Sequence, residues 1–511
     1  MQWFPWWRKR LGADLAPDID YLALAPEITL AVTAVVVLML DLFLPRSQKY
    51  WTAIVAVLGV SFTALPLIAL AVSDVGVRTM LGGSFVVDDF ALVLKGLFVV
   101  AGYLVLLMSV SYIESDRYYQ GEYYFLMLMS ILGTLVLASS RDLISLFIAI
   151  ELVSQPMYLL AGWRKGDLRS NEASLKYFLL GVLASALMLY GMSFVYGLTG
   201  ELTFAGIAQA GAGMADDPAF IMALLFMIAG FGFKVSAVPF HFWAPDTYEG
   251  APTPVTAYLS VSSKAAGFVA LLVVLYSAFP DAAGVWGPAV WILAALSMTL
   301  ANLTALRQTN IVRLLAYSSV AQAGFMLVPF AAAATTDAIG LGEAFAATVT
   351  YIVIYAFMNL GAFAVVIAGA RKTGTGEIAG WGGLGSYAPG LGLLAAAFFF
   401  SLAGIPPLAG WIAKLVMFSA AMGAGSSWMV VLAAIAAVNA VIALFYYARV
   451  VKTIWMDPVP ATAPDEEVRT GTVAGSLGLA LGLSVAVVVA AGFFPSLITF
   501  FSEATKALAG G

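Results

Sequence analysis

The chain has 511 residues, of which 62% are hydrophobic and only 10% are charged, whereas an ordinary soluble domain has roughly 25% charged residues. This composition excludes a soluble globule, because so much apolar surface cannot be hidden without a membrane. The lack of cysteine excludes disulfides, thiolate metal ligands and cysteine-bound iron–sulfur clusters in this chain, and the net charge of −5 says little about partners.

The first segment, residues 1–20, has the composition of an anchor at the membrane surface. Trp3, Trp6 and Trp7 precede a basic cluster at positions 8–10, and acidic residues follow. No apolar core or small-residue cleavage site follows the basic cluster, so the pattern does not predict a signal peptide. Tryptophan is typical of the lipid headgroup level, and we therefore expect an interfacial extension.

Apolar runs then recur almost without pause, each long enough to cross a hydrocarbon core about 30 Å thick. Lipid offers no hydrogen bonds, so these runs are predicted to be helices, and they lack the alternation of barrel strands. We expect an all-α polytopic membrane protein with about 14 transmembrane helices. The runs are 24–44, 51–72, 90–112, 122–139, 142–162, 171–197, 219–243, 253–279, 285–306, 310–333, 343–370, 389–421, 426–452 and 472–500.

The basic residues of the predicted loops indicate an orientation. Thirteen lie in odd-numbered loops and only Arg78 and Arg141 lie in even-numbered ones. Because basic loops stay in the cytoplasm, both termini are expected outside, although the cluster at positions 8–10 points the other way. The thirteen are Arg46, Lys49, Arg117, Arg164, Lys165, Arg169, Arg307, Arg313, Arg371, Lys372, Arg449, Lys452 and Arg469.

Two of the five lysines inside the predicted spans have an ordinary structural explanation. Lys95 lies about five residues into its run and is expected to extend its ammonium to the membrane surface. Lys176 follows Glu172 by four residues, which predicts a solvated pair at a helix end.

The other three lysines, Lys234, Lys264 and Lys414, lie deep in their runs. Lys264 is roughly 16 Å from the start of its span at about 1.5 Å per residue. Among the acidic residues, only Glu151 is comparably deep. A charge at the bilayer centre costs about 2.5–3.5 kcal/mol on insertion scales, so these side chains must face protein or water.

A lysine and a glutamate in such a place form a proton switch if their contact can form and break. The alternative is a static ion pair that fixes the register of two helices. Three lysines for the single deep carboxylate of Glu151 exceed what a static pair needs, which favours the switch.

Further polar residues near these sites are candidate relay groups. Thr256, Ser260 and Lys264 follow one another at intervals of four and are predicted to share one helical face. Such hydroxyls also often bond only to preceding carbonyls. His241, the single histidine, would share a face with Lys234 if the helix continued past Pro239, and it is otherwise an interfacial residue.

Prolines are expected to break two spans beside a buried lysine. Pro239 interrupts the seventh run after Lys234, and Pro406 and Pro407 interrupt the twelfth before Lys414. These spans are five apart, so residues 122–284 and 285–452 are predicted to be two inverted five-helix repeats. Residues 21–121 then hold the first three spans, and residues 453–511 hold a cytoplasmic loop and the fourteenth.

The sequence contains no Walker loop, no dinucleotide fingerprint and no histidine pair that would hold a haem. We therefore expect no cofactor and no metal in this chain, and no nucleic-acid partner. The glycine-rich stretch 374–385 is interpreted as a flexible connector rather than a phosphate site, because it lies between apolar spans.

Several stretches resemble the antiporter-like N subunits of respiratory complex I, the proton-pumping NADH-quinone oxidoreductase. The resemblance covers residues 24–455. The stretches are ELVSQPMYLLAGW, LRSNEASLKYFLLG, GFKVSAVPFHFWAPDTYEGAPTPV, SSKAAGF, QTNIVRLLAYSSVAQAG and SLAGIPPLAGWIAK.

The resemblance implies a proton-translocating subunit whose relay is Glu151, Lys234, Lys264 and Lys414. In it Glu151 tunes Lys234, Lys264 passes the proton centrally, and Lys414 communicates with the outer face. Energy would come from electron transfer in partner subunits that hold FMN, iron–sulfur clusters and quinone. The implied partners are the antiporter-like L and M subunits, the small A, J, K and H types and the peripheral arm, in a bacterial cytoplasmic (inner) membrane.

Two features separate this chain from its sister subunits. The M subunits carry a glutamate where Lys414 stands, and the L subunits continue into a long lateral helix. A subunit of an Mrp-type cation/proton antiporter is the alternative function, and a purely structural spacer in the membrane arm is a third.

Overall fold

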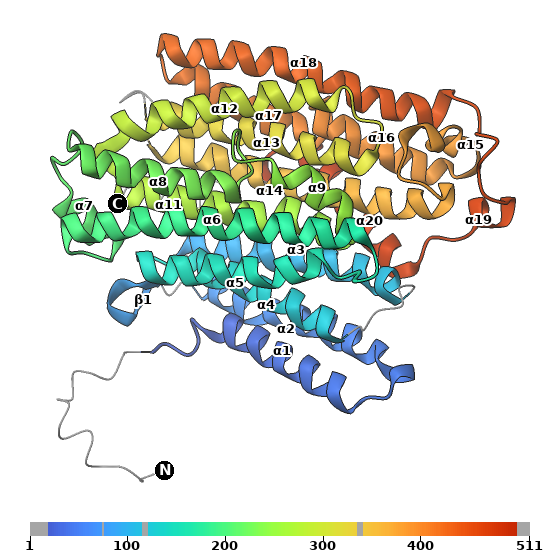
Figure 1. Ribbon diagram of the computed structural model, residues 1–511, viewed down its shortest axis with the longest axis horizontal. Coiled ribbons are helices and arrows are strands. Elements are labelled where there is room, and N and C mark those ends of the chain that lie inside the picture. Colours follow the sequence, from blue (N-terminus) through green and yellow to red (C-terminus); the bar gives the residue numbers. More distant parts are fainter. Residues whose placement is uncertain (1–18, 74–75, 115–120, 335–340, 498–511) are drawn as a thin grey trace.

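The computed structural model describes residues 19–73, 76–114, 121–334 and 341–497. The predicted extension thus lies almost wholly outside the described residues. The N-terminal half of the fold is built from helices (Figure 1). They are α1 (Ala25–Phe43), α2 (Tyr50–Val72), α3 (Asp89–Glu114), α4 (Gly121–Ser139), α5 (Leu143–Ala161), α6 (Leu168–Thr199), α7 (Phe204–Ala210), α8 (Pro218–Lys234), α9 (Trp243–Gly250), α10 (Thr253–Tyr258), the π-helical turn η4 (Leu259–Ser263) and α11 (Lys264–Ala278).

The C-terminal half is equally helical. Its helices are α12 (Ala283–Ala305), α13 (Ile311–Ala333), α14 (Leu341–Thr373), α15 (Leu384–Tyr387), α16 (Pro389–Ala403), α17 (Ala409–Gly423), α18 (Ser427–Met456), α19 (Glu466–Thr470) and α20 (Gly475–Phe493). Short 3₁₀ turns occur at η2 (Arg46–Gln48), η3 (Leu81–Gly83), η5 (Pro280–Ala282) and η6 (Ile378–Trp381). Strands β1 (Arg78–Met80) and β2 (Phe85–Val87) form an antiparallel hairpin in which Arg78 pairs with Val87.

Twelve helices of the described chain are long and apolar enough to cross a membrane. They coincide with twelve of the fourteen predicted runs, which confirms the all-α polytopic class. The seventh run holds the shorter helix α8 and the non-helical residues before α9, and the twelfth run holds the shorter helices α16 and α17. Whether these complete fourteen crossings stays a prediction. The predicted end of the thirteenth run is four residues short, because α18 continues to Met456.

The two expected helix breaks are present. The residues between α8 and α9, 235–242, contain Pro239, and the residues between α16 and α17, 404–408, contain Pro406 and Pro407. Proline alone does not explain them, since Pro66 and Pro156 lie inside α2 and α5. Each break also has a left-handed residue, Ser236 with φ 59° or Gly404 with φ 88°, which turns the backbone out of the helix.

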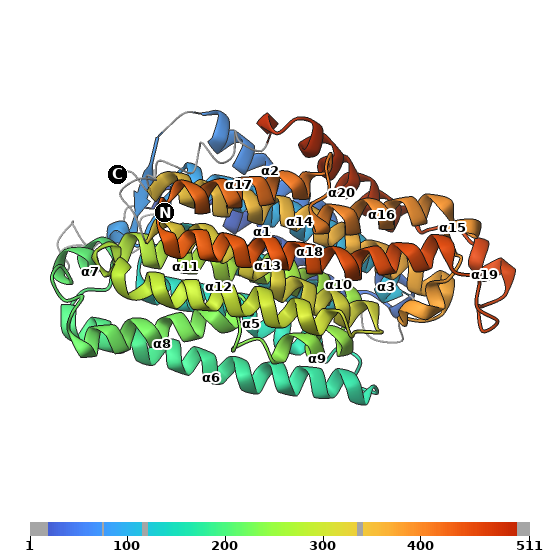
Figure 2. The same cartoon turned by 90° about the horizontal axis from the view of Figure 1, so that it is seen from above.

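The helices lie side by side with their axes roughly aligned, and the chain passes from α1 at one edge to α18 at the other (Figure 1). The last helix, α20, returns to pack on α3, α14 and α17. The β1–β2 hairpin and α7 lie at one end of the helices, while α15 and α19 lie at the opposite end (Figure 2). These elements of two even-numbered loops thus lie opposite those of two odd-numbered loops, but which end faces the cytoplasm stays a prediction.

Two spans, residues 253–278 and 342–373, are enclosed along almost their whole length by other helices. The first is the continuous rod of α10, η4 and α11, and the second is α14. By contrast α1, α2, α6 and α18 turn many large apolar side chains outward. In a chain of this composition, such outward faces suit lipid or a neighbouring subunit. Lys264 therefore belongs to the central rod of the fold.

The interpretation of residues 374–385 as a flexible connector is wrong. The stretch forms η6 and α15, and the indole of Trp381 is completely buried. Gly383 has φ 67°, and a Cβ at that position would meet Val459 at 2.5 Å. The glycines therefore allow a tight turn and close packing against the segment that follows α18.

Candidate functional site

Lys234 and Glu151 meet as the sequence predicts. Lys234 is the last residue of α8, and its Nζ lies 3.6 Å from Oε1 of Glu151 on α5. The same amine donates a shorter hydrogen bond, 2.8 Å, to Oγ of Ser154. The lysine side chain is 6% exposed and the glutamate side chain 20%. The Glu151 carboxylate is thus partly exposed on the side of the helical bundle, because other helices cover only part of α5.

Two further polar groups hold the Glu151 carboxylate. Ser185 of α6 donates to Oε1 at 2.5 Å, and Gln155 donates to Oε2 at 2.8 Å. Gln155 follows Glu151 by four residues on α5, a spacing that brings side chains together on one helical face. Ser154, three residues after Glu151, has a spacing that would also have identified it. Ser185 lies on another helix, and no sequence pattern indicates it.

The end of α8 is a favourable place for an ammonium group. Helix C-termini carry partial negative charge on carbonyl groups that lack a helical partner. One of them, the Phe233 carbonyl, accepts a bond from Nε1 of Trp243 at 3.2 Å. On the other side, Gly267 lies so close that a Cβ there would be 2.9 Å from Cβ of Lys234. The absence of a side chain at Gly267 lets α11 pack directly on the lysine.

Lys264 is bound by neutral acceptors. It begins α11 directly after the π-helical turn η4, and its Nζ donates to the carbonyl and the hydroxyl of Ser319 on α13, at 2.7 and 2.9 Å. Among the described residues no carboxylate lies within ion-pair distance of this amine. Lys264 is therefore a buried amine without a counter-ion in the part of the chain that the structure describes.

The π-helical turn η4 interrupts the regular helix expected over Thr256, Ser260 and Lys264, and a relay role for the two hydroxyls stays a prediction. The turn η4 has i→i+5 bonding and shifts the helical phase between them. The hydroxyl of Thr256 donates to the Tyr248 carbonyl at 2.9 Å, and that of Ser260 donates to Ala257 at 2.8 Å. Both hydroxyls thus bond to backbone carbonyls, which was the alternative explanation. Ser260 also accepts a bond from Asn359 of α14 at 2.8 Å.

The condition for a shared face of His241 and Lys234, a helix that continues past Pro239, is not met. The helix ends at Lys234, and His241 lies in the non-helical segment before α9. Its Nδ1 is buried and has no hydrogen-bond partner within the described ranges. A role for His241 in proton transfer stays a prediction.

Lys414 lies at the second break. It is on α17, and its Nζ donates to the carbonyl of Ala403, the last residue of α16. The ammonium also lies 5.1 Å from the ring centre of Phe325 on α13, a cation–π distance. At Gly404 a Cβ would lie 2.6 Å from Cδ of Lys414, so this position requires glycine for space as well as for its φ.

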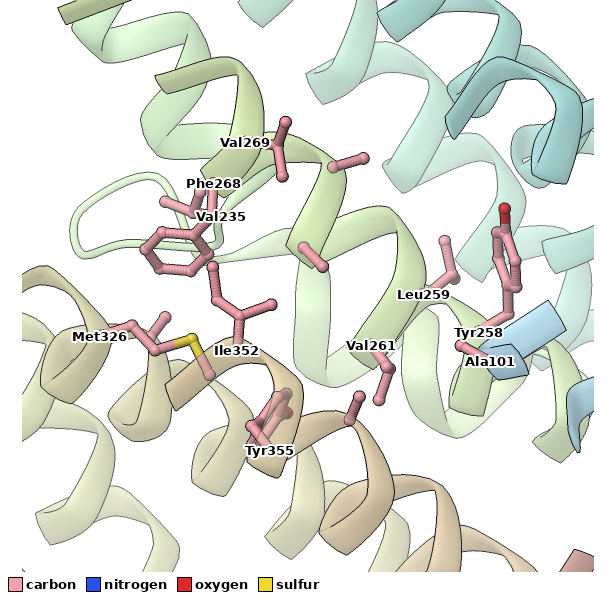
Figure 3. Packing of buried hydrophobic residues seen from close by; sticks show 14 of the residues in the cluster. Ala101, Val235, Tyr258, Leu259, Val261, Phe268, Val269, Met326, Ile352 and Tyr355 are labelled. Carbon is pink, nitrogen blue, oxygen red and sulfur yellow. The ribbon is translucent and has the colours of Figure 1, made fainter. Parts of the chain in front are cut away.

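Lys234 and Lys414 therefore share a setting, the carboxyl end of the first half of a broken helix. Between them the central rod supplies Lys264. Figure 3 shows a part of the buried apolar cluster, in which Val235, directly after Lys234, lies beside Phe268 of α11. Three amines, each with its own acceptors inside apolar packing, form discrete positions for a proton. The described residues contain no cluster of acidic or histidine side chains with the arrangement of a metal site.

Two expectations about the remaining lysines change. Lys95 does not reach the membrane surface: its side chain is 0% exposed, and its Nζ lies 2.8 Å from Oε1 of Glu27 on α1. The expected pair of Lys176 and Glu172 is present at 2.6 Å. It is part of a wider network, because Lys176 also lies 2.6 Å from Asp246, which in turn pairs with Arg313 at 2.9 Å.

Known structures have the same architecture. A chain of respiratory complex I from Thermus thermophilus, with bound aureothin, matches with a TM-score of 0.74 and 31% identity, over 93% of this chain and 98% of that one. A chain of the Mrp complex from Dietzia matches with a TM-score of 0.81 and 22% identity, over 96% and 98%. The second likeness concerns the fold alone.

Sequence relatives narrow the family. A family model described as NADH:quinone oxidoreductase/Mrp antiporter, TM, matches residues 140–440. NADH-quinone oxidoreductase subunit N of Trichlorobacter lovleyi is 38% identical over 497 residues, 96% of this chain and 98% of the relative. Subunit N 2 of Streptomyces griseus is 43% identical over 480 residues, 90% and 87%. The chain therefore belongs to the family of NADH-quinone oxidoreductase N subunits, within the NADH:quinone oxidoreductase/Mrp antiporter membrane proteins.

Proposed function

We propose that this chain is a proton-translocating membrane subunit of respiratory complex I and that Glu151, Lys234, Lys264 and Lys414 carry its proton. The observation that supports this most is the asymmetry of the three buried amines. Lys234 has a carboxylate at 3.6 Å, whereas among the described residues Lys264 and Lys414 have only neutral acceptors. A proton that leaves Lys234 therefore has two further amines ahead of it.

The contact of Lys234 with Glu151 is suited to opening. When it opens, Lys234 retains its bond to Ser154, and Glu151 retains its bonds to Ser185 and Gln155. Breaking a buried ion pair is costly mainly because it leaves groups unsatisfied. Substitute partners lower that cost, so the proton affinity of Lys234 responds to a small displacement of the carboxylate.

The relatives are named as N subunits of NADH-quinone oxidoreductases, and we extend that role to this chain. FMN, iron–sulfur clusters and quinone then belong to partner subunits, which include the L, M, A, J, K and H types and the peripheral arm. The membrane is the bacterial cytoplasmic membrane, with both termini on its outer face. Residues 122–284 and 285–452 form the inverted repeats, and each contains one broken helix as its fourth member.

The direct test is Lys234→Ala in the assembled complex, reconstituted in vesicles, with proton uptake measured alongside quinone reduction. We expect the ratio of protons to electrons to fall. Lys452→Ala is the matched control, because that lysine is 62% exposed and pairs with Asp457 at 3.4 Å. An unchanged ratio in Lys234→Ala would contradict the proposal.

The second candidate is a subunit of an Mrp-type cation/proton antiporter, since the family description names both classes. The N-subunit relatives are nearer, at 38–43% identity against 22% for the Mrp chain. Sodium-dependent proton exchange by the purified chain, free of redox subunits, would favour the antiporter.

A further inference from the structure

A buried amide lies between the sites of Lys264 and Lys414. Gln322 of α13 is 1% exposed, and its Nε2 donates to the Leu402 carbonyl at 3.0 Å. The same nitrogen lies 3.4 Å from the hydroxyl of Tyr447 on α18. Its Oε1 accepts a bond from the hydroxyl of Tyr351 on α14 at 2.6 Å. Four helices, α13, α14, α16 and α18, thus meet at this side chain.

The place of Gln322 in the line of amines follows from its two neighbours. On α13 it is three residues after Ser319, on the same side of the helix, and Ser319 accepts both bonds of Lys264. On α16 its partner Leu402 directly precedes Ala403, whose carbonyl accepts the bond of Lys414. The amide therefore connects the acceptor of one lysine to the acceptor of the other.

The chemistry of the Gln322 amide is suited to blocking proton transfer. A side-chain amide has two N–H donors and one oxygen acceptor and does not ionise near neutral pH. Both N–H groups of Gln322 have partners and its oxygen holds the Tyr351 hydroxyl. The hydroxyl of Tyr447 bonds further to that of Ser318 at 2.5 Å. Within the described residues no hydrogen bond joins these hydroxyls to Lys264 or Lys414, so no continuous chain of exchangeable groups links the two amines while the amide stays in this arrangement.

We propose that Gln322 is the gate of the relay: while bonded to the Leu402 carbonyl, its amide prevents proton exchange between Lys264 and Lys414. The gate opens when that bond breaks and the amide turns away. Because Gln322 and Lys414 bind consecutive carbonyls at the end of α16, movement of this helix end affects both. The inference rests on the proposed relay function and names the point at which the relay is controlled.

The test replaces the amide by a group of the same shape that exchanges protons. The Gln322→Glu complex is reconstituted in vesicles, a pH gradient is imposed without redox substrates, and the passive proton leak is followed with an enclosed pH dye. We expect the leak to rise by about tenfold, below the about 10²-fold that a well-placed proton-transfer group contributes.

Asn302→Asp is the matched control. Asn302 is an equally buried amide on α12, bonded to Asn439 at 3.2 Å and Tyr446 at 3.0 Å, and it touches neither lysine site. It tests whether any new buried acid makes the protein leak. An equal leak in both variants, or none in Gln322→Glu, would overturn the gate.

Two more variants make the result decisive. Gln322→Glu combined with Lys264→Met should lose the leak, and a leak that persists would contradict a route through Lys264. If Gln322→Glu does not assemble, Tyr351→Phe removes the bond to Oε1 and should raise the leak by a smaller factor. Unchanged pumping in Lys234→Ala would sink the relay itself, whereas lost pumping in Lys234→Ala with no leak in Gln322→Glu would sink only the gate.

Discussion

In the described part of the chain, two glutamate–lysine pairs lie inside the helical bundle, and they differ in distance, in exposure and in the groups that surround them. Glu27 and Lys95 lie 2.8 Å apart with side chains 8% and 0% exposed. Glu151 and Lys234 lie 3.6 Å apart at a helix break, and hydroxyls contact both of them. In the first pair each ion depends on the other. In the second each ion has a substitute partner.

The difference teaches that a buried ion pair is not by itself a proton switch. The atoms Glu27 Oε2 and Lys95 Nζ have no hydrogen-bond partner in the described ranges beyond the pair itself. Phe85 of the hairpin lies 5.1 Å from the ammonium and closes the site. Opening this pair would expose two unsatisfied charges to apolar surroundings, so it acts as a fastening between α1 and α3.

The largest expected effect is a loss of stability when the Glu27–Lys95 pair between α1 and α3 is broken. Glu27→Gln leaves the Lys95 ammonium without its counter-charge, and breaking one partner of a buried pair costs about 3–5 kcal/mol. Thermal melting of the purified complex in detergent measures the loss. Glu27→Leu combined with Lys95→Met should recover most of it, because apolar replacement removes both charges.

The same variants test the comparison itself. The surviving Glu27→Gln complex should keep its normal ratio of protons to electrons, since no relay residue is altered. A fall of that ratio at normal complex content would mean that Glu27 and Lys95 also carry protons.

Glu151→Gln should have the next largest effect, now on transport rather than stability. Removing the carboxylate that tunes Lys234 is expected to slow proton translocation by about 10²-fold, or about 2.7 kcal/mol. The melting temperature should change little, because Ser154 still accepts from the lysine. Proton uptake and quinone reduction are compared in the same vesicles. A stability loss as large as that of Glu27→Gln, with pumping intact, would reverse the roles of the two pairs.

The sequence alone predicted the parts of this comparison that depend on local chemistry. Apolar runs predicted the long helices because lipid leaves the backbone no other partner. The prolines near Lys234 and Lys414 predicted both breaks. Pro66 and Pro156, however, lie within unbroken helices, so the left-handed residues decided where a helix ends. The left-handed conformation of Ser236 could not be predicted from its residue type, because serine does not usually adopt it.

Apart from the contact of Lys234 with Glu151, which the family resemblance implied, the contacts between helices were not predicted from the sequence. Lys95 pairs with Glu27 on α1, and Glu151 accepts a hydrogen bond from Ser185 on α6. Such contacts depend on how the helices pack. The π-helical turn directly before Lys264 was likewise not predicted from the spacing of Thr256 and Ser260. A spacing of four is informative only while the helix stays regular.

Ser154→Ala should have a smaller effect that separates the substitute partner from the pair. It removes the hydroxyl that accepts from Lys234, and a hydrogen bond to a charged group contributes about 1.5 kcal/mol or more, so pumping should slow by about tenfold. Ser130→Ala is the control, because that buried hydroxyl donates at 2.8 Å to the neighbouring Val153 carbonyl and contacts no amine. Equal slowing in both would show that packing, and not the substitute bond, is responsible.

The smallest expected effect is at the hairpin that covers the Lys95 site. The Ala23 N–H, together with Arg78, holds the pKa of Asp20 below its usual range. A depressed carboxyl pKa adds stability above the unfolded value of about 3.9, and this is lost as pH falls through the folded pKa. The Asp20 side chain is 36% exposed, so Asp20→Asn should cost only about 0.5 kcal/mol. Hydrogen exchange of residues 76–88 should differ from wild type at pH 6, and the difference should narrow as pH falls through the lowered pKa of Asp20, whereas Asp457→Asn, distant from the hairpin, should leave exchange there unchanged. A difference that does not change with pH would mean that Asp20 stabilises the hairpin through its shape rather than its charge, and the cover over Glu27 and Lys95 would then be independent of pH.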